Sequence, residues 1–272
     1  MNNTNDIYKS MIASLSSAII TKTITNPLER VKILQQVQYH YSINKYNNIY
    51  NSLKYIIKNE SVKGLFKGNI INILRVAPAF ILKFEFNKQF NNIFVNNIQN
   101  PHYYNYLLSG ICTGVSQILI TYPIETIRTL KSLDNNMYKN NSILYCIKDI
   151  YNKKGLNGYY TGLPLSLFAG SLFIGTQFSI YNYMKNYYTD NILIAGVISG
   201  SVSLTLFYWG DSIKRNLHVN IINKTYSNTY NCIKFLGFNN IYAGYKVALL
   251  KICIESPIQF YIYEHIYMLF KN

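Results

Sequence analysis

Apolar residues are concentrated in long segments that are separated by polar connections. Three of these segments contain no Asp, Glu, Lys or Arg, namely Tyr103–Ile124, Gly155–Met184 and Asn191–Gly210. A helix that crosses a membrane needs about 20 mainly apolar residues, so each segment is long enough to span a bilayer. The pattern predicts an all-α membrane protein.

Three further apolar segments each carry one or two isolated charges. They are Ser10–Leu28 with Lys22, Gly68–Lys83 with Arg75, and Ala248–Tyr263 with Lys251 and Glu255. A charge within a membrane helix usually faces the interior of a bundle or a water-filled cavity. The chain is therefore expected to form six transmembrane helices around a polar interior.

The connections between the segments differ in charge. Residues 45–67 contain five lysines and one acid, residues 131–154 contain five lysines and two acids, and residues 215–234 contain three basic residues and no acid. The opposite connections, residues 89–105 and 186–190, together hold one acid and no base. Because basic residues favour the inner side of a membrane, the three basic connections are expected to share one side.

The chain contains an internal repeat. PLERVK at residues 27–32 recurs as PIETIR at 123–128 and, in a weaker form, as WGDSIK at 209–214. A second motif follows each copy, and its last residue is Gly68, Gly162 or Gly244. At equal spacing after these glycines come Lys83-Phe84, Gln177-Phe178 and Gln259-Phe260. Three tandem units account for the chain, and we predict a single domain over 1–272 with repeats at 1–97, 98–188 and 189–272.

These motifs resemble the repeated signature of the mitochondrial carrier family, in which a proline is followed by an acid and then a base, and later by an aromatic-base-glycine motif. The first repeat matches through Glu60 and GLFKG, and the second through Pro123, Glu125 and Arg128, whereas the third has Trp209 in place of proline. The resemblance covers essentially the full length. It implies six transmembrane helices in three pseudo-symmetric tandem repeats, each with a short matrix-side helix.

The resemblance also implies a function and a location. It predicts a solute transporter, not an enzyme, that works by alternating access through a central cavity. We expect a multi-pass protein of the mitochondrial inner membrane with both termini toward the intermembrane space. Residues 1–9 contain neither an apolar signal core nor an Arg-rich presequence, so no cleavable presequence is expected.

The acid and base of each motif lie three residues apart, on one face of a helix. By resemblance they form a matrix gate, in which Glu29 pairs with Arg128, Glu125 with Lys214, and Asp211 with Lys32. Gln36 resembles the glutamine with which the family braces such a pair. Ser132 and His218 stand at the equivalent positions of the other repeats and are not expected to brace in the same way.

A second, cytoplasmic gate is expected at the opposite ends of the even-numbered helices. Of the charges that the family pattern requires there, Lys185 and Glu264 are present, while Lys88 occupies an acid position and Asn91 a base position. We therefore predict a weak outer gate and a resting protein that opens to the intermembrane space.

Substrate contacts are expected midway along the even-numbered helices. Seven residues after each reference glycine stand Arg75, Ala169 and Lys251, with Val76, Gly170 and Ile252 beside them, and Lys22 adds a further base. Arginine can hold phosphate or carboxylate through two hydrogen bonds, and the small pair leaves room for a flat ring such as adenine. Alternatively, Lys251 pairs internally with Glu255, four residues further on.

The first two helices resemble those of the adenine-nucleotide, ATP-magnesium/phosphate and coenzyme A branch. A small anionic solute such as a nucleotide or a coenzyme A-like compound is therefore the expected substrate, and the net charge of +15 suits it. An ordinary ADP/ATP exchanger is not expected, because the third repeat lacks the arginine triplet of that subgroup and reads Lys214-Arg215-Asn216.

Membrane lipid is the second expected partner. Helix starts attract anionic headgroups, so Lys67, Gly68, Gly162 and Gly244 are predicted to bind cardiolipin. The four cysteines and four histidines lie far apart without the spacing of a metal site, so neither a metal nor a cofactor is predicted. The protein is expected to be a monomer that binds no nucleic acid.

Other interpretations remain open at this stage. One alternative is a carrier for a different solute, such as S-adenosylmethionine, an amino acid or a carboxylate. The weakened third motif and outer gate also suit a carrier-fold scaffold that does not transport. A soluble nucleic-acid binder needs a patterned basic face, and the long uncharged segments argue against it.

Overall fold

The computed structural model describes residues 2–41, 46–96, 98, 102–133, 142–188 and 191–271. Within these ranges the regular elements are all helices. The long ones are α1 (Asn2–Ile24), α4 (Asn69–Asn91), α5 (Tyr103–Lys131), α9 (Ser171–Tyr187), α10 (Ile192–Asn223) and α12 (Tyr245–Lys271). The shorter ones are α2 (Asn26–Val37), η1 (Gln38–Tyr41), α3 (Ile49–Gly64), η2 (Asn92–Asn96), α7 (Ile143–Lys154), η3 (Leu156–Gly158), α8 (Leu163–Leu165), η4 (Ser166–Gly170) and α11 (Thr229–Ile241).

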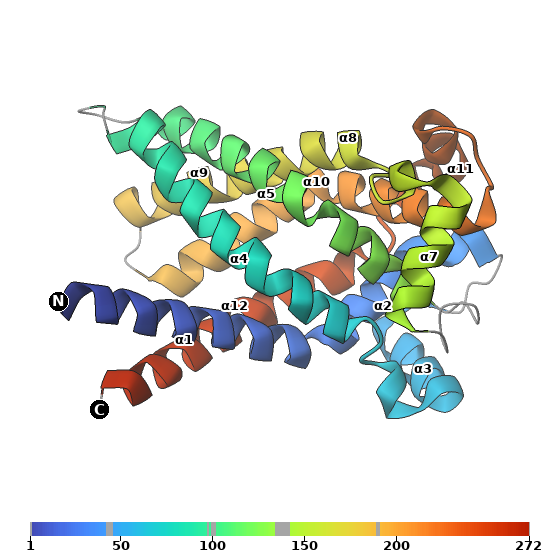
Figure 1. Cartoon of the computed structure of the whole chain (residues 1–272), viewed down its shortest axis with the longest axis horizontal. Helices are drawn as coiled ribbons and strands as arrows, with labels where there is room; N and C mark the ends of the chain where they lie inside the picture. The colour runs from blue at the N-terminus through green and yellow to red at the C-terminus, as the bar shows by residue number, and fades with distance from the viewer. Residues whose placement is uncertain are drawn as a thin grey trace.

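The long helices form a closed ring. Helix α1 packs against α4, α4 against α5, α5 against α9, α9 against α10, α10 against α12, and α12 against α1. Both termini lie at one end of the bundle, and the short helices α3, α7 and α11 lie at the other (Figure 1). The predicted six-helix fold with a short helix in each repeat is confirmed.

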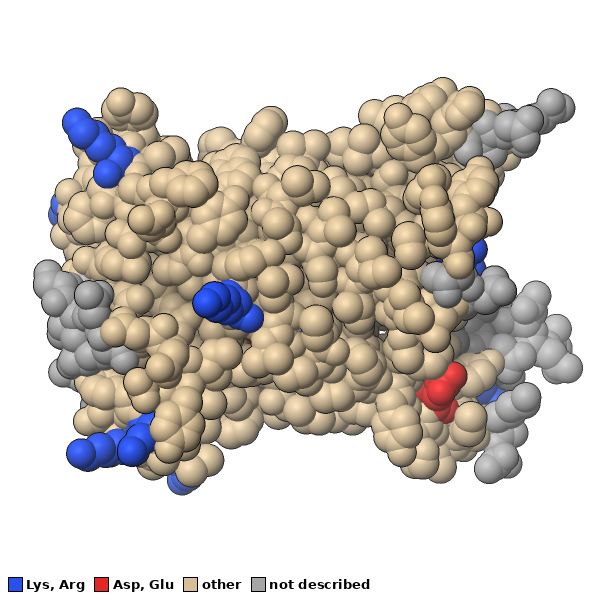
Figure 2. Space-filling model, turned by 180° about the vertical axis from the view of Figure 1, so that it is seen from behind, with Lys and Arg blue, Asp and Glu red and all other residues tan. Residues whose placement is uncertain are grey.

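By length and composition, three of the described helical segments are sufficient to cross a membrane alone: Tyr103–Lys131, Leu156–Tyr187 and Ile192–Asn223. They contain the three uncharged segments of the sequence. The view in Figure 2 agrees, because most of that face is uncharged and its basic atoms gather mainly at the end of α3, α7 and α11. We call this the matrix end, after the orientation expected from the basic connections.

Each short helix at the matrix end begins with the same kind of cap. The side chains of Asn48, Ser142 and Asn228 accept a hydrogen bond from the backbone N–H three residues further on. Such a cap satisfies an N–H group that has no partner within the helix. The residues between these helices and the preceding long helices lie in part outside the described ranges, at 42–45 and 134–141.

The three transmembrane helices that carry the repeated motif, α1 with α2, α5 and α10, differ in shape at the motif. The first is broken at Thr25, two residues before Pro27, whereas α5 continues through Pro123. Helix α10, which has Trp209 at this position, is continuous over 32 residues. There Gly210 faces Ala169 so closely that a Cβ atom at position 210 would overlap the alanine methyl group. The third repeat therefore uses a glycine contact where the others have proline.

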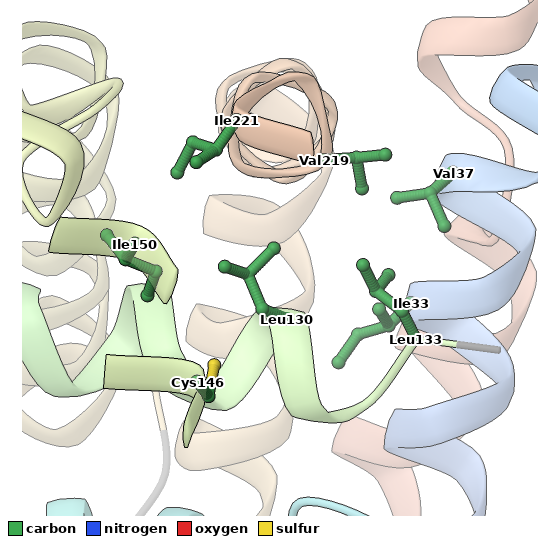
Figure 3. Close-up of a cluster of buried hydrophobic side chains, with 8 residues drawn as sticks. All are labelled: Ile33, Val37, Leu130, Leu133, Cys146, Ile150, Val219 and Ile221. Atoms are coloured by element: carbon green, nitrogen blue, oxygen red, sulfur yellow. The ribbon is translucent and has the colours of Figure 1, made fainter. Parts of the chain in front are cut away.

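A hydrophobic cluster holds the matrix end together. Figure 3 shows its members, which come from α2, α5, α7 and α10 and from the second residue after α5: Ile33, Val37, Leu130, Leu133, Cys146, Ile150, Val219 and Ile221. All eight are fully buried. Burying an aliphatic side chain contributes about 1.5–3 kcal/mol to stability. This cluster therefore fixes α2, α5 and α10 relative to one another.

Glycines four residues apart let helix backbones approach closely, and from sequence this packing is predicted for Gly110 with Gly114 and for Gly196 with Gly200. Gly110 and Gly114 do so, since a Cβ at either position would lie 2.6 or 2.8 Å from a Cα atom of α9. The prediction is wrong for Gly196 and Gly200. Gly196 has open space beside it, and Gly200 faces the side chain of Ile252. Both line the interior of the bundle, where the absence of a side chain leaves volume instead of close packing.

The predicted repeat boundaries remain a prediction. The first boundary, at residues 97 and 98, involves Asn97, which lies outside the described residues. The second, between 188 and 189, adjoins residues 189 and 190, which also lie outside them.

Candidate functional site: a central cavity closed by ion pairs

A cavity of about 500 Å³ lies inside the ring of helices. Every long helix contributes to its wall, as does α2. The charged wall residues are Lys22, Lys32, Arg75, Lys83, Glu125, Asp211, Lys214, Lys251 and Glu255. Small residues widen it on other sides, among them Ala169 and Gly170 from η4. This segment is a π-helical turn, a local widening that is frequent at functional sites.

Ion pairs between repeats close one end of the cavity. The distance is 3.0 Å between Arg128 and Glu29, 2.8 Å between Lys214 and Glu125, and 2.9 Å between Lys32 and Asp211. These are the three pairs expected from the resemblance. In two of the motifs the acid and base of the same motif, three residues apart, also lie close together. The distance is 3.6 Å between Lys32 and Glu29 and 3.2 Å between Lys214 and Asp211.

The three residues that lie four positions after the base of each motif, Gln36, Ser132 and His218, make different contacts. Gln36 donates from Nε2 to Asp211 across 3.2 Å, beside the Lys32 pair. Ser132 donates to the backbone carbonyl of Arg128, and the Nε2 atom of His218 lies 3.3 Å from the hydroxyl of Tyr122. Only the glutamine reaches a gate carboxylate among these three side chains.

Arg215 is a gate residue that the sequence analysis did not identify. Its guanidinium lies 3.3 Å from Glu125, 3.5 Å from Asp211 and 4.0 Å from Glu29, and it also donates to Thr129. The side chain is 3% exposed. All three gate acids therefore share one central cation. The only sequence signal was a second base next to Lys214, which has no counterpart in the other motifs.

Most of the predicted substrate residues line the cavity. Arg75, Ala169, Gly170, Lys251, Ile252 and Lys22 are all in its wall. Val76 is not among the wall residues of the described chain and is 5% exposed, buried within the helix packing. Neighbouring helical residues point about 100° apart, so Val76 turns away from the surface that Arg75 faces.

Two of the predicted substrate bases are already paired with acids. Lys251 lies 2.9 Å from Glu29 and 3.2 Å from Glu255. Lys22 forms a close ion pair with the other oxygen of Glu255. The internal pairing that was the alternative for Lys251 is therefore present, and the lysine also reaches a gate acid that sequence spacing did not suggest.

Arg75 differs from these lysines. In the described part of the chain it has no ion pair, and its Nε is a buried donor without a hydrogen-bond partner. Lys83, two turns along α4, also lacks an acid partner within the described residues and lies 5.0 Å from the ring centre of Phe178. Lys83 was recognised as part of the repeat but not as a cavity residue. Its recurrence as Gln177 and Gln259 was the available signal, because these also line the cavity.

The residues predicted for the cytoplasmic gate lie apart. Lys88, Lys185 and Glu264 are exposed, and none takes part in an ion pair with another described residue. Asn91 accepts a hydrogen bond from Ser109, on the neighbouring helix α5. In this conformation the three ion pairs between repeats are formed, and the residues predicted for the cytoplasmic gate form no ion pair within the described part of the chain.

The predicted lipid-binding glycines share one conformation. Gly68, Gly162 and Gly244 have φ near 80°, in the left-handed region that favours glycine. However, the N–H directly after each glycine is already bonded to the carbonyl three residues before it, which leaves that donor unavailable to a headgroup. Lys67 lies 2.6 Å from Glu60, so its charge is partly neutralised within the protein.

A closed ring of membrane helices around a charged cavity, shut at one end by ion pairs, defines a membrane transport protein. Comparison with known proteins specifies the class. The family model described as "Mitochondrial carrier protein" matches residues 3–98, 99–192 and 191–272. The chain belongs to this family, whose members are transporters and not enzymes. It is therefore a multi-pass carrier of the mitochondrial inner membrane.

Several relatives can be aligned with most of this chain. Mitochondrial substrate carrier family protein A of Dictyostelium discoideum is 29% identical over 98% of this chain and 86% of its own length. The mitochondrial adenine nucleotide transporter of Arabidopsis thaliana is 28% identical over 78% of this chain and 67% of its own length. Mitochondrial carrier protein CoAc2 of Zea mays is 24% identical, with 90% and 81% covered.

Proposed function

We propose that this carrier transports an anionic metabolite, such as a nucleotide or a coenzyme A-like compound, by alternating access through the central cavity. The observation that carries the proposal is the cavity arginine Arg75, which has no acid partner among the described residues, in a wall that also contains the small pair Ala169 and Gly170. A guanidinium binds phosphate in a bidentate manner. The similarity to adenine nucleotide transporters supports the same substrate class.

In the proposed cycle, substrate enters from the intermembrane space while the matrix gate is closed. Each gate pair attracts by roughly 4 kcal/mol at an effective dielectric constant near 20, before the cost of desolvation is subtracted. Substrate can open the gate only if it binds the open form more tightly. Lys251 couples substrate binding to the opening of the gate, because a substrate anion that binds this lysine competes with Glu29 for it.

The proposal includes the orientation and the lipid. Both termini face the intermembrane space, since they lie at the end opposite the basic short helices. Cardiolipin binds near Lys67, Gly68, Gly162 and Gly244, where its headgroup competes with Glu60 for the lysine. The carrier acts as a monomer, because the cavity lies within one chain.

Transport by proteoliposomes tests the proposal. Purified carrier is reconstituted and offered labelled adenine nucleotides, coenzyme A, S-adenosylmethionine, amino acids and carboxylates, with and without magnesium. We expect saturable uptake of a nucleotide or of coenzyme A, and its loss in Arg75→Gln. Saturable uptake of only a cationic or zwitterionic solute contradicts the substrate class. Absence of saturable uptake for the whole panel supports the scaffold interpretation instead.

A further inference from the structure

The bases of the cavity wall fall into two groups. Four of them are engaged with acids: Lys22 with Glu255, Lys32 with Asp211, Lys214 with Glu125, and Lys251 with Glu29 and Glu255. Two have no acid partner among the described residues, and these are Arg75 and Lys83. Among the described residues, these two side chains are thus the cavity-wall bases that have no acid within ion-pair distance.

Both side chains come from the same helix. Arg75 and Lys83 are eight residues apart in α4, which corresponds to about 12 Å along the helix axis and about 80° around it. Both line the one cavity. The two charges are thus set apart along the depth of the cavity, and not gathered at a single point midway through the membrane.

Each of these side chains has a feature that suits a ligand. The Nε of Arg75 is buried and lacks a hydrogen-bond partner, a state that costs free energy unless a ligand or water satisfies it. The ammonium group of Lys83 lies 5.0 Å from the centre of the Phe178 ring, a cation–π contact that holds it without neutralising it. Both groups can therefore accept an anion without losing an internal ion pair.

The other repeats do not reproduce this second charge. Gln177 and Gln259 occupy the positions equivalent to Lys83 and also line the cavity. A glutamine can hydrogen-bond a ligand but supplies no net charge. Of these three equivalent positions, all are polar and the one on α4 is cationic.

We propose that Arg75 and Lys83 form a two-point anion site, so that the solute carries two anionic groups set apart along its length, one bound by each residue. This inference rests on the proposed function and narrows its substrate class. A solute with one compact anionic group occupies only one of the two points. Lys83 is then a determinant of specificity that acts by the separation of charges.

Binding of synthetic anions tests the site independently of transport. Purified full-length carrier in detergent is titrated calorimetrically, at constant ionic strength, with methylphosphonate and with alkane α,ω-bisphosphonates of increasing chain length. The wild type is expected to bind at least one long bisphosphonate roughly tenfold or more tightly than methylphosphonate, since each charged hydrogen bond adds that order of affinity.

Variants distinguish binding at the two-point site from attraction by the overall positive charge of the protein. Lys83→Gln, which introduces the residue that repeats two and three already have, should reduce the preference for the bisphosphonate to near unity while methylphosphonate affinity is kept. Lys83→Arg should retain the preference. Lys246→Gln removes an exposed lysine of α12 outside the cavity wall and should leave it unchanged. Thermal unfolding of each variant checks its fold.

The outcomes distinguish this inference from the proposed function. An unchanged preference in Lys83→Gln, equal weakening of both ligands, or no preference in the wild type overturns the two-point site, even if proteoliposomes transport a nucleotide. A preference that depends on Lys83 in a carrier that transports none of the anionic solutes supports the site and overturns the function.

Discussion

Lys251 in the cavity wall donates a hydrogen bond to Glu29 of the matrix gate across 2.9 Å. The same ammonium group lies 3.2 Å from Glu255, which in turn pairs with Lys22. A continuous chain of ion pairs thus runs from the wall of the cavity to the gate. Any change in the charge of the cavity is transmitted to Glu29 by direct contact, with no need for a longer pathway.

Removing the acid in this chain should strengthen anion binding. In Glu255→Gln the charges of Lys22 and Lys251 are less compensated, so an anionic substrate should bind several-fold more tightly. The measurement is the KM of uptake in proteoliposomes at low ionic strength. A matched variant, Glu85→Gln, removes an exposed acid that is not in the cavity wall and should leave KM unchanged. A higher KM in Glu255→Gln would contradict the expectation.

Breaking one gate pair should destabilise the conformation with a closed matrix gate. Either Glu125→Gln or Lys214→Gln leaves a charge with an incomplete set of partners, at a cost of about 3 kcal/mol. The double variant removes both charges and should cost less than the sum of the two. The free energy of unfolding in detergent gives this double-mutant cycle. Additive effects would mean that the two residues do not act as a pair.

Strengthening the outer gate should shift the conformational equilibrium. Lys88→Asp with Asn91→Lys introduces the family charge pattern where exposed residues lie apart, and the matrix-open form should become more populated. The readout is labelling of a cysteine placed at position 177 by a membrane-impermeant thiol reagent added from outside. Labelling should slow in the gate variant. An unchanged rate would refute the weak outer gate.

The glycine of the third motif should tolerate no side chain. Gly210→Ala places a methyl group against Ala169, and overpacking of this kind costs typically 1–3 kcal/mol. Gly196→Ala, in the same helix and with open space beside it, should be neutral or slightly stabilising. The midpoints of thermal unfolding compare the two. Equal behaviour would show that the contact between α10 and η4 is not close.

His40 should make the matrix end sensitive to acid. Burial lowers the pKa of His40 from 6.5 to about 4, and its ring lies 2.8 Å from the Tyr226 hydroxyl. Because the unfolded chain then binds more protons than the folded one between these values, stability should fall as the pH drops from about 6.5 to about 4. His40→Gln should flatten this part of the curve, measured by thermal unfolding. An unaltered slope would exclude His40 as the cause.

The resemblance to the carrier family, carried by the acid and base of each motif, predicted the three ion pairs between repeats, and the structure contains all three. Spacing could not identify Arg215, since its role depends on the centre of the bundle, where three helices bring their acids within reach of one guanidinium. The pairing of Lys251 with Glu29 was also unpredictable, because the residues lie 222 positions apart.

The sequence by itself determined the six apolar segments, the three repeats and the family, because hydrophobic length, charge and motif order are local properties of the chain. The tertiary structure alone decided which charges are paired: it placed Lys22 and Lys251 against acids, left Arg75 and Lys83 without an acid partner among the described residues, and turned Val76 away from the cavity. The physical reason is that charge compensation depends on distances of a few ångströms between helices. Such distances are fixed only when the ring closes.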